Sequence, residues 1–359
     1  MLKWPSHGAN PHYLFEAVNL PVPKEKLDFS ANINPLGPPP VLKENWFRLL
    51  ESVMEYPDPH GTILKSKIAK KEGLHESHVL LGNGGAEIIS LIGRMLAGKR
   101  AVIVQPAFSE YEEACRVSGC HVQYHQLEEG WEWKDDDLNE KLKSADALFL
   151  CNPNNPTGVY YSRSIILYLL EECRRHQCML IVDEAFYDFL AEYESITLDI
   201  KEYPNLLIIR SMTKMFAIPG LRLGYLLADP AVIKKIAAFQ PHWSTNAIAL
   251  MAGEWCLDSE AYIKETIALV EKERTRLFHF YQKQGLLVSS SRVNFYLLKD
   301  TSLDDQHSFL QYLLQKGMIP RHTVNFPGLE GKWLRFAIKG PEANDKLMGE
   351  VEKWLDSRL

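Results

Sequence analysis

The chain has 359 residues, a length that suggests two domains at the usual size of about 100 to 200 residues each. It carries 40 Lys and Arg against 46 Asp and Glu, and the resulting net charge of -6 offers no broad basic surface for nucleic acid or anionic lipid. The first residues lack an apolar signal segment, and no uncharged stretch reaches the roughly 18 residues that span a bilayer. We therefore expect a cytoplasmic protein that binds neither nucleic acid nor membrane.

The six cysteines lie mostly inside apolar runs, and no two of them form a C-x-x-C pair. Such positions are typical of reduced residues in a protein core, rather than of a disulfide framework or a metal site. We therefore predict no metal centre. The six are Cys115, Cys120, Cys151, Cys173, Cys178 and Cys256.

The pattern along the chain predicts an α/β fold with an N-terminal arm and two domains. Residues 1–40 are rich in Pro, Asn and Gly and lack sustained periodicity, which indicates an arm that packs with the smaller domain. Residues 41–235 form the predicted large domain, where short apolar runs alternate with amphipathic stretches in the manner of repeated βαβ units. Residues 236–359 form the smaller α+β domain, with expected helices near 245–283 and strands near 285–300 and 333–338.

Five apolar runs in the predicted large domain are continuous rather than alternating, as expected of parallel strands that helices cover on both faces. In such a sheet, ligands bind beyond the carboxyl ends of the strands. The segments that follow the five runs are unusually polar, so they hold the candidate site. The runs are Val79–Leu81, Ala101–Val104, Ala147–Leu150, Met179–Val182 and Leu206–Ile209.

The segment Gly82–Glu87 joins the first of these runs to a predicted helix. The free N–H groups of Gly85 and Ala86, together with the positive end of that helix, are suited to holding a phosphate. A tight turn without a ligand is the alternative that the segment alone leaves open. Its glycine spacing matches neither the dinucleotide fingerprint nor the Walker loop, which argues against a nucleotide.

Two charged residues at strand ends indicate the chemistry. Asp183 follows Leu180–Val182 in a largely apolar setting, where a carboxylate is costly unless a cation such as a protonated ring nitrogen pairs with it. A helix-capping role is the alternative. Lys214 follows the last run, with Arg222 eight residues later. Partial burial beside cations lowers the pKa of a lysine and makes it a nucleophile toward an aldehyde, whereas a lone lysine is usually a solvated surface charge.

Three motifs, in this order, resemble those of fold-type I enzymes that depend on pyridoxal 5'-phosphate (PLP). The resemblance spans nearly the whole chain and implies a PLP-dependent transferase fold with a mainly parallel central sheet. The motifs are NPNNPTG at Asn152–Gly158, DEAF at Asp183–Phe186, and SMTK at Ser211–Lys214 followed by GLRLGY at Gly220–Tyr225.

The resemblance also implies roles for individual residues. Lys214 would carry the cofactor as a Schiff base and later move protons, and Asp183 would keep the ring nitrogen protonated. Asn155 would donate a hydrogen bond to the phenolate oxygen, and Phe108 would stack on the ring. The cofactor phosphate would be held by Ser211, Arg222, Gly85 and Ala86, and by Tyr56 from the other subunit of a homodimer.

Phe186 departs from the family pattern. Many relatives carry a tyrosine at this position, which donates a second hydrogen bond to the phenolate. Without that donor the phenolate is less stabilised, so we expect a raised pKa of the imine unless another group compensates.

The N-terminal arm indicates a branch of the family. The overall likeness is to the branch of histidinol-phosphate aminotransferases and threonine-phosphate decarboxylases, which act on small phosphorylated amines. The segments His7–Asn10, Asp28–Gly37 and Ala217–Gly220 resemble the decarboxylases, although Ala9 replaces a glycine. The resemblance implies decarboxylation of L-threonine O-3-phosphate to (R)-1-amino-2-propanol O-2-phosphate in cobalamin biosynthesis. A histidinol-phosphate aminotransferase is the alternative.

Several residues are expected to bind a small phosphorylated substrate. Arg335 matches the arginine that binds the substrate carboxylate in aminotransferases, and Arg321 would hold a second anion, because a guanidinium suits either group through two hydrogen bonds. His7 and Asn32 would close over the substrate phosphate, and Asn155 completes the set. Surface salt bridges and a solvated histidine are the alternatives. A ligand-sensing regulator would need a helix-turn-helix pattern, which the sequence lacks.

Overall fold

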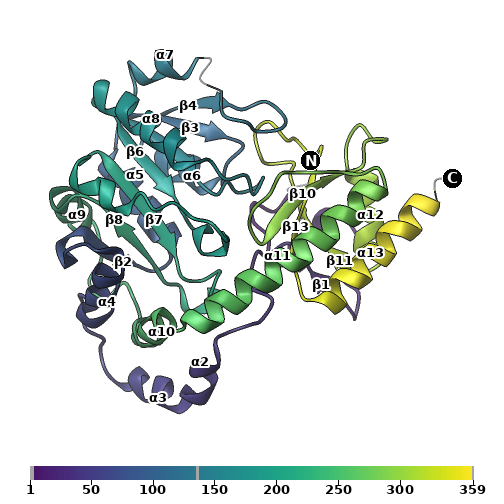
Figure 1. The fold of residues 1–359 in the computed structure, drawn as a ribbon, viewed down its shortest axis with the longest axis horizontal. Coiled ribbons are helices and arrows are strands. Elements are labelled where there is room, and N and C mark those ends of the chain that lie inside the picture. The colour runs from purple at the N-terminus through teal and green to yellow at the C-terminus, as the bar shows by residue number, and fades with distance from the viewer. Residues whose placement is uncertain (1–3, 135–136, 358–359) are drawn as a thin grey trace.

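The computed structural model of the protein describes residues 4–134 and 137–357 (Figure 1). The larger part of the molecule, mostly teal, is built around one sheet, and the smaller part, green and yellow, around another. The long helix α11 (Glu260–Lys283) runs from beneath the first part to the second (Figure 1).

The central sheet has seven strands in the order β2-β8-β7-β6-β5-β3-β4. β8 pairs antiparallel with both β2 and β7, and the other neighbouring strands are parallel, which confirms the mainly parallel sheet. Since β8 opposes both of its neighbours, β2 and β7 run in the same direction and end at the same edge. The strands are β2 (Val79–Gly82), β3 (Arg100–Gln105), β4 (His121–Gln126), β5 (Ala147–Cys151), β6 (Met179–Asp183), β7 (Leu206–Ser211) and β8 (Gly224–Leu227).

The sequence does not predict two of these strands, β4 and β8. β4 lies at the edge of the sheet, and its polar sequence HVQYHQ is largely accessible to solvent, so it lacks the continuous apolar run of a buried strand. β8 has only four residues and directly follows the Gly-Leu-Arg-Leu segment. The expectation that Val79–Leu81 pairs with parallel neighbours is wrong, because β2 pairs with the antiparallel β8.

Helices cover both faces of the central sheet (Figure 1). Leu148 and Val182 belong to the apolar cluster on one face, and their neighbours Phe149 and Ile181 belong to the cluster on the other. Each such buried side chain contributes about 1.5–3 kcal/mol. The sheet is therefore buried on both faces, as its continuous apolar runs predict. The helices of this part are α4 (Thr62–Glu72), α5 (Gly85–Met95), α6 (Glu110–Val117), α7 (Leu138–Leu142), α8 (Arg163–Arg175), α9 (Pro230–Ala237) and α10 (Ala247–Leu257).

The smaller part contains an antiparallel sheet in the order β12-β13-β10-β9. Its strands are β9 (Leu287–Val288), β10 (Phe295–Lys299), β12 (Arg321–His322) and β13 (Leu334–Ala337). Helices α12 (His307–Gln315) and α13 (Pro341–Asp356) accompany α11. The strands expected near 285–300 and 333–338 are thus confirmed, and the helices expected near 245–283 are α10, which packs against α4 in the larger part, and α11.

The N-terminal segment is tied to the smaller part by a strand. β1 (Leu27–Asp28) pairs in parallel with β11 (Met318–Ile319). The segment also contains the short helices α1 (Pro11–Ala17), α2 (Pro40–Glu44) and α3 (Trp46–Glu51), of which α2 and α3 project below the larger part (Figure 1). The domain boundaries at residues 40 and 235 stay a prediction.

All six cysteines are buried and free, which confirms their assignment to the core. Within the described residues, no helix combines the length and apolar character needed to cross a membrane.

Candidate active site

A cavity of about 650 Å³ lies where the carboxyl edge of the central sheet meets the smaller sheet and the N-terminal segment. Asp183 and Ser211 reach it from the ends of β6 and β7, and Arg321 and Arg335 reach it from β12 and β13. With the exception of Tyr56, every predicted site residue lines this cavity. These residues are His7, Asn32, Gly85, Ala86, Phe108, Asn155, Asp183, Ser211, Lys214, Arg222, Arg321 and Arg335.

One end of the cavity combines a helix N-terminus with hydroxyl and guanidinium groups. α5 begins directly after Gly84, whose φ is 79°. A Cβ at Gly84 would lie 2.3 Å from Nη2 of Arg222, so glycine is what allows the guanidinium to approach this turn. The first N–H groups of α5 have no partner within the helix, and Ser211 Oγ lies 2.9 Å from Thr213 Oγ1. The arrangement is suited to a phosphate group.

Lys214 lies just beyond β7, between the phosphate-suited end and the arginines of the smaller sheet. Burial, together with the positive charges of Arg222 and Arg335, lowers the pKa of Lys214 to about 8, although the carboxylate of Asp183 opposes the shift. An amine with this pKa is partly neutral near pH 7, which a nucleophile toward an aldehyde requires. The structure thus places the predicted catalytic lysine in the electrostatic setting expected of it.

Asp183, the last residue of β6, is buried and receives two neutral donors. Its Oδ2 accepts from the hydroxyl of Tyr111 at 2.6 Å, and its Oδ1 accepts from the backbone N–H of Ala185 at 2.9 Å. Burial raises the pKa of Asp183, and these hydrogen bonds oppose the rise. Because no cation forms an ion pair with it within the described residues, the carboxylate can take one from a ligand. The next helical turn begins at Tyr187 with Phe186 as its N-cap, so Asp183 does not cap a helix.

Arg335 on β13 is held by oxygen atoms that carry no net charge. Its Nη1 donates to Asn155 Oδ1 at 2.5 Å and its Nη2 donates to the carbonyl of Ser30 at 2.7 Å, while the buried Nε has no partner among the residues that the structure describes. Burial lowers the pKa of Arg335 to about 10, so the group stays charged at neutral pH. A guanidinium only donates, so Asn155 must turn its oxygen toward Arg335 and keeps its amide N–H groups for a ligand.

Arg321 on β12 is also surrounded by neutral acceptors. Its Nη2 donates to the carbonyl of Ser6 and to Asn325 Oδ1, both at 2.7 Å, and its Nη1 lies 2.5 Å from His322 Nε2. Burial and the positive charge of Arg335 together lower the pKa of Arg321 to about 9. Burial and the charge of Arg321 lower the pKa of His322 to about 3, so this imidazole is neutral and accepts.

The surface salt bridge is therefore the wrong interpretation for both arginines. The cavity holds four basic side chains that form no ion pair within the described part of the chain: Lys214, Arg222, Arg321 and Arg335. Such a concentration of positive charge without direct ion pairs is suited to binding more than one anionic group.

The N-terminal segment forms one wall of the cavity. His7 is half-exposed, and its Nε2 lies 2.9 Å from Glu110 Oε1. Asn32 is buried, and its Oδ1 has no hydrogen-bond partner. The N–H of Ala9 donates to Ser30 Oγ at 2.9 Å, which fixes this wall against the bend that follows β1. His7 is thus engaged by a carboxylate rather than free in solvent, and Asn32 has an acceptor available for a ligand.

Two phenylalanines complete the lining. Phe108 lies edge-on to Tyr111, with 5.9 Å between the ring centroids. Phe186 lies edge-on to Phe295, with 4.7 Å between the centroids, and offers no hydroxyl to the cavity.

Tyr56 lies outside the cavity of its own chain. It is 85% exposed and rests against Trp243, with 5.1 Å between the ring centroids. Its predicted contact with the cofactor of a second subunit stays a prediction.

Residues 24–350 match the aminotransferase class I and II family. The chain belongs to this family. The threonine-phosphate decarboxylase of Salmonella typhimurium is 35% identical to it, over 98% of this chain and 96% of that protein. An adenosylcobalamin biosynthesis bifunctional protein of Leptospira interrogans is 35% identical over 96% of this chain and 40% of that protein. The crystal structure of the histidinol-phosphate aminotransferase from Clostridium acetobutylicum superposes with a TM-score of 0.87 at 32% identity, covering 92% of this chain and 99% of that one.

Three side chains that hold charged residues of this aminotransferase-family site are not predicted from the sequence. Tyr111 contacts Asp183 across 72 positions of sequence, and its only signal is a place three residues after Phe108 at the start of α6. Asn325 and His322 both hold Arg321. Their proximity to Arg321 in the sequence predicts that they lie near it. It does not predict that they contact the guanidinium as neutral acceptors.

Proposed function

We propose that this chain is a PLP-dependent decarboxylase that converts L-threonine O-3-phosphate into (R)-1-amino-2-propanol O-2-phosphate and carbon dioxide, in cobalamin biosynthesis. The observation that carries the proposal is the pair of buried arginines, Arg321 and Arg335, which face one cavity without an ion-pair partner in the described residues. The likeness to the decarboxylase of Salmonella typhimurium along nearly the full length supports it. The free, buried cysteines suit the reducing cytoplasm in which we place the enzyme.

The residues of the cavity fit each part of PLP. The N-terminus of α5, Ser211 and Arg222 would hold the phosphate, since the turn at this end brings N–H, hydroxyl and guanidinium donors together. Asp183 would pair with the ring nitrogen, and the amide N–H of Asn155 would donate to the phenolate oxygen. Lys214 would hold the cofactor covalently, and Phe108 would stack on its ring.

Once bound, PLP supplies an electron sink for the bond that breaks at Cα of the substrate. Asp183 would hold a proton on the ring nitrogen, because its buried carboxylate has only neutral hydrogen-bond donors among the described residues. The ammonium form of Lys214, with its lowered pKa, would give Cα the proton that replaces the departing carboxylate.

The two arginines would fix the orientation of the substrate. Threonine phosphate carries a carboxylate on Cα and a phosphate on the next carbon. We assign the carboxylate to Arg335, which is tied to Asn155, and the phosphate to Arg321, with His7 and Asn32 beside it. Anchoring both anions fixes the rotation about Cα and so selects the bond that breaks, an effect that contributes several kcal/mol in well-oriented reactions, on the order of a thousandfold in rate.

A histidinol-phosphate aminotransferase is the second candidate, and the likeness to the Clostridium acetobutylicum structure favours it. Histidinol phosphate carries no carboxylate, so it would leave one buried arginine without an anion. The test compares threonine phosphate alone with histidinol phosphate plus 2-oxoglutarate. We expect turnover of the first without 2-oxoglutarate. Faster formation of glutamate from the second pair would move the assignment to the aminotransferase.

We also propose that the protein is a homodimer. The turn of chain around α3 exposes large apolar side chains, and such exposed patches mark association surfaces. We call this set the α3 surface, and a second copy would cover it and bring Tyr56 to the neighbouring cofactor phosphate. The set consists of Trp46, Phe47, Leu50, Val53, Met54 and Tyr56.

A further inference from the structure

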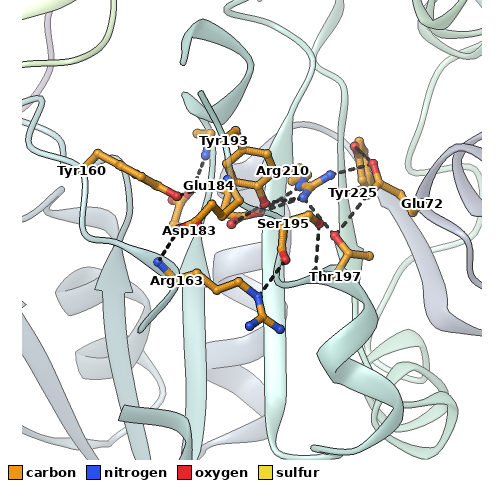
Figure 2. Close-up of polar contacts among 12 residues, drawn as sticks. Glu72, Tyr160, Arg163, Asp183, Glu184, Tyr193, Ser195, Thr197, Arg210 and Tyr225 are labelled. Atoms are coloured by element: carbon orange, nitrogen blue, oxygen red, sulfur yellow. Dashed lines mark hydrogen bonds and ion pairs between the residues drawn. The ribbon is translucent and has the colours of Figure 1, made fainter. Parts of the chain in front are cut away.

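A buried ion triad of Glu72, Glu184 and Arg210 lies beside the ends of β6 and β7 (Figure 2). Arg210 is 1% exposed and lies between Glu184 and Glu72. Its Nε and Nη2 contact Glu184 Oε2 at 3.0 and 2.9 Å, and its Nη1 contacts Glu72 Oε1 at 2.6 Å. Arg210 therefore links the end of β6 to its own strand β7, and links β7 to the last residue of α4.

Both members of the Glu184–Arg210 pair are chain neighbours of cavity residues. Glu184 follows Asp183, and Arg210 precedes Ser211. Successive side chains of a strand point to opposite faces of a sheet. Asp183, Ile209 and Ser211 line the cavity, so the ion pair is on the opposite face of the same two strand ends.

Backbone pairing between β6 and β7 stops at this point. The register partners run as far as Asp183 and Ile209, and the N–H of Glu184 donates to the carbonyl of Ile209 at 2.8 Å. Beyond Ile209, β7 continues beside β8, with Arg210 opposite Tyr225 and Ser211 opposite Gly224. The side chains of Glu184 and Arg210 therefore continue the connection where the backbone ladder between β6 and β7 ends.

The surroundings hold the ion pair in one geometry. The hydroxyl of Tyr193 donates to the carboxylate of Glu184 at 2.8 Å, and Arg210 Nη2 donates to Thr197 Oγ1 at 3.0 Å. Arg210 Cζ also lies 3.9 Å from the ring centroid of Tyr187. A buried pair with every donor engaged is stiff, whereas a partly satisfied one is not.

We infer that Glu184 and Arg210 are positioning residues for the cofactor: their ion pair fixes the two strand ends and thereby the spacing between Asp183 and Ser211. The inference rests on the proposed binding of PLP, whose ring nitrogen and phosphate these two residues would contact. The ring of PLP is rigid, and binding groups must be held to within about 0.5 Å of the productive geometry. Loosening the two strand ends therefore weakens the cofactor's fit at both of its ends.

Glu72 provides a matched control. It is buried and contacts the same guanidinium, as well as the hydroxyl of Thr197, but it joins α4 rather than β6 to β7. Glu72→Ala and Glu184→Ala each remove one of the two carboxylates and leave Arg210 with the other. The two variants therefore lose comparable ion pairs, and only Glu184→Ala cuts the connection between the strand ends.

The experiment measures the dissociation constant of PLP by titrating each apoprotein and the thermal midpoint of the same samples. We expect both variants to lower the midpoint, Glu184→Ala to raise the dissociation constant at least tenfold, and Glu72→Ala to raise it less than threefold. Equal changes in the dissociation constant would overturn the inference. A wild-type chain that binds no PLP would overturn the proposed function as well, which distinguishes the two failures.

The isosteric variants Glu184→Gln and Glu72→Gln cover the case in which an alanine variant does not fold. A glutamine keeps one oxygen to accept from Arg210 and loses the charge and the second acceptor, which takes the hydroxyl of Tyr193 in Glu184 and that of Thr197 in Glu72. Glu184→Gln should therefore raise the dissociation constant of PLP by an intermediate factor, and Glu72→Gln should leave it within twofold of the wild type. The reverse order of the two glutamine variants would also contradict the positioning role.

Discussion

Arg321 and Arg335 lie directly opposite each other on β12 and β13, and neither meets a carboxylate within 4.0 Å in the part of the chain that the structure describes. Burial lowers the pKa of both groups, and for Arg321 the charge of Arg335 adds to the effect. Two buried like charges side by side are costly without counter-charges. A substrate with two anionic groups would supply the missing counter-charges and offset this destabilisation on binding.

Asn325→Asp tests whether the charge of Arg321 is available to the substrate phosphate. The change keeps the side-chain shape and the contact with Nη2, but it places a negative charge beside the guanidinium, which then forms an ion pair within the protein. We expect KM for threonine phosphate to rise about tenfold or more, equivalent to roughly 1.4 kcal/mol, with a smaller rise for unphosphorylated threonine. Steady-state kinetics on both compounds measure this. Asn325→Ser is the control without a new charge, and an equal KM for the two variants would contradict the prediction.

Covalent capture of PLP by the apoprotein should accelerate with pH and level off above about pH 8. The protonated amine does not attack an aldehyde, and burial and its cationic neighbours lower the pKa of Lys214 to about 8, so the protonated form disappears as the pH rises through that value. A lysine with the usual pKa of about 10.4 would continue to gain rate to higher pH. Stopped-flow absorbance over this range gives the midpoint. Arg335→Ala removes a positive neighbour and should move the midpoint upward; an unmoved midpoint would argue against this electrostatic account.

Asp183→Asn should lower turnover on the order of a hundredfold while PLP still binds, because a neutral amide does not hold the ring nitrogen protonated. Tyr111→Phe removes only the donor to Asp183 Oδ2 and keeps the carboxylate, so its loss of turnover should be below about tenfold. Turnover and PLP titration on both variants separate chemistry from binding. An unchanged rate for Asp183→Asn would show that protonation of the ring does not limit the reaction.

Phe47→Glu on the α3 surface should dissociate the proposed homodimer. Phe47 is 79% exposed in the single chain, and a carboxylate buried in an interface is costly. Leu287→Glu is the control, since Leu287 is also exposed but lies on β9 in the smaller part. Sedimentation velocity reports the state of both variants. A wild-type chain that is monomeric and fully active would refute the dimer.

The sequence predicts the parts of the fold whose physics is local. Continuous apolar runs predict β5, β6 and β7 because buried strands need apolar residues on both faces, and the polar residues after them predict the edge that bears the cavity. β4 is not predicted, because an edge strand tolerates polar residues and so lacks an apolar run. The antiparallel pairing of β2 is not predicted either, because it depends on β8, which the sequence also does not predict.

Site residues that stand in a sequence motif can be predicted from the sequence. Site residues that depend on tertiary contacts cannot. Lys214, Asp183 and Asn155 stand in recognisable motifs and reach one cavity. The contact between Tyr111 and Asp183 depends on which segments the fold brings together, and so does the absence, among the described residues, of a counter-charge beside Arg321. No local pattern in the sequence encodes such contacts.

The most direct test of the proposed decarboxylation follows the carboxyl carbon of threonine phosphate. The substrate is labelled with carbon-13 at that position and incubated with the PLP-loaded enzyme in the absence of 2-oxoglutarate. We predict that each mole of substrate consumed releases one mole of labelled carbon dioxide and leaves an amine that retains the phosphate. Label retained in a keto acid, with consumption only after 2-oxoglutarate is added, would contradict the account.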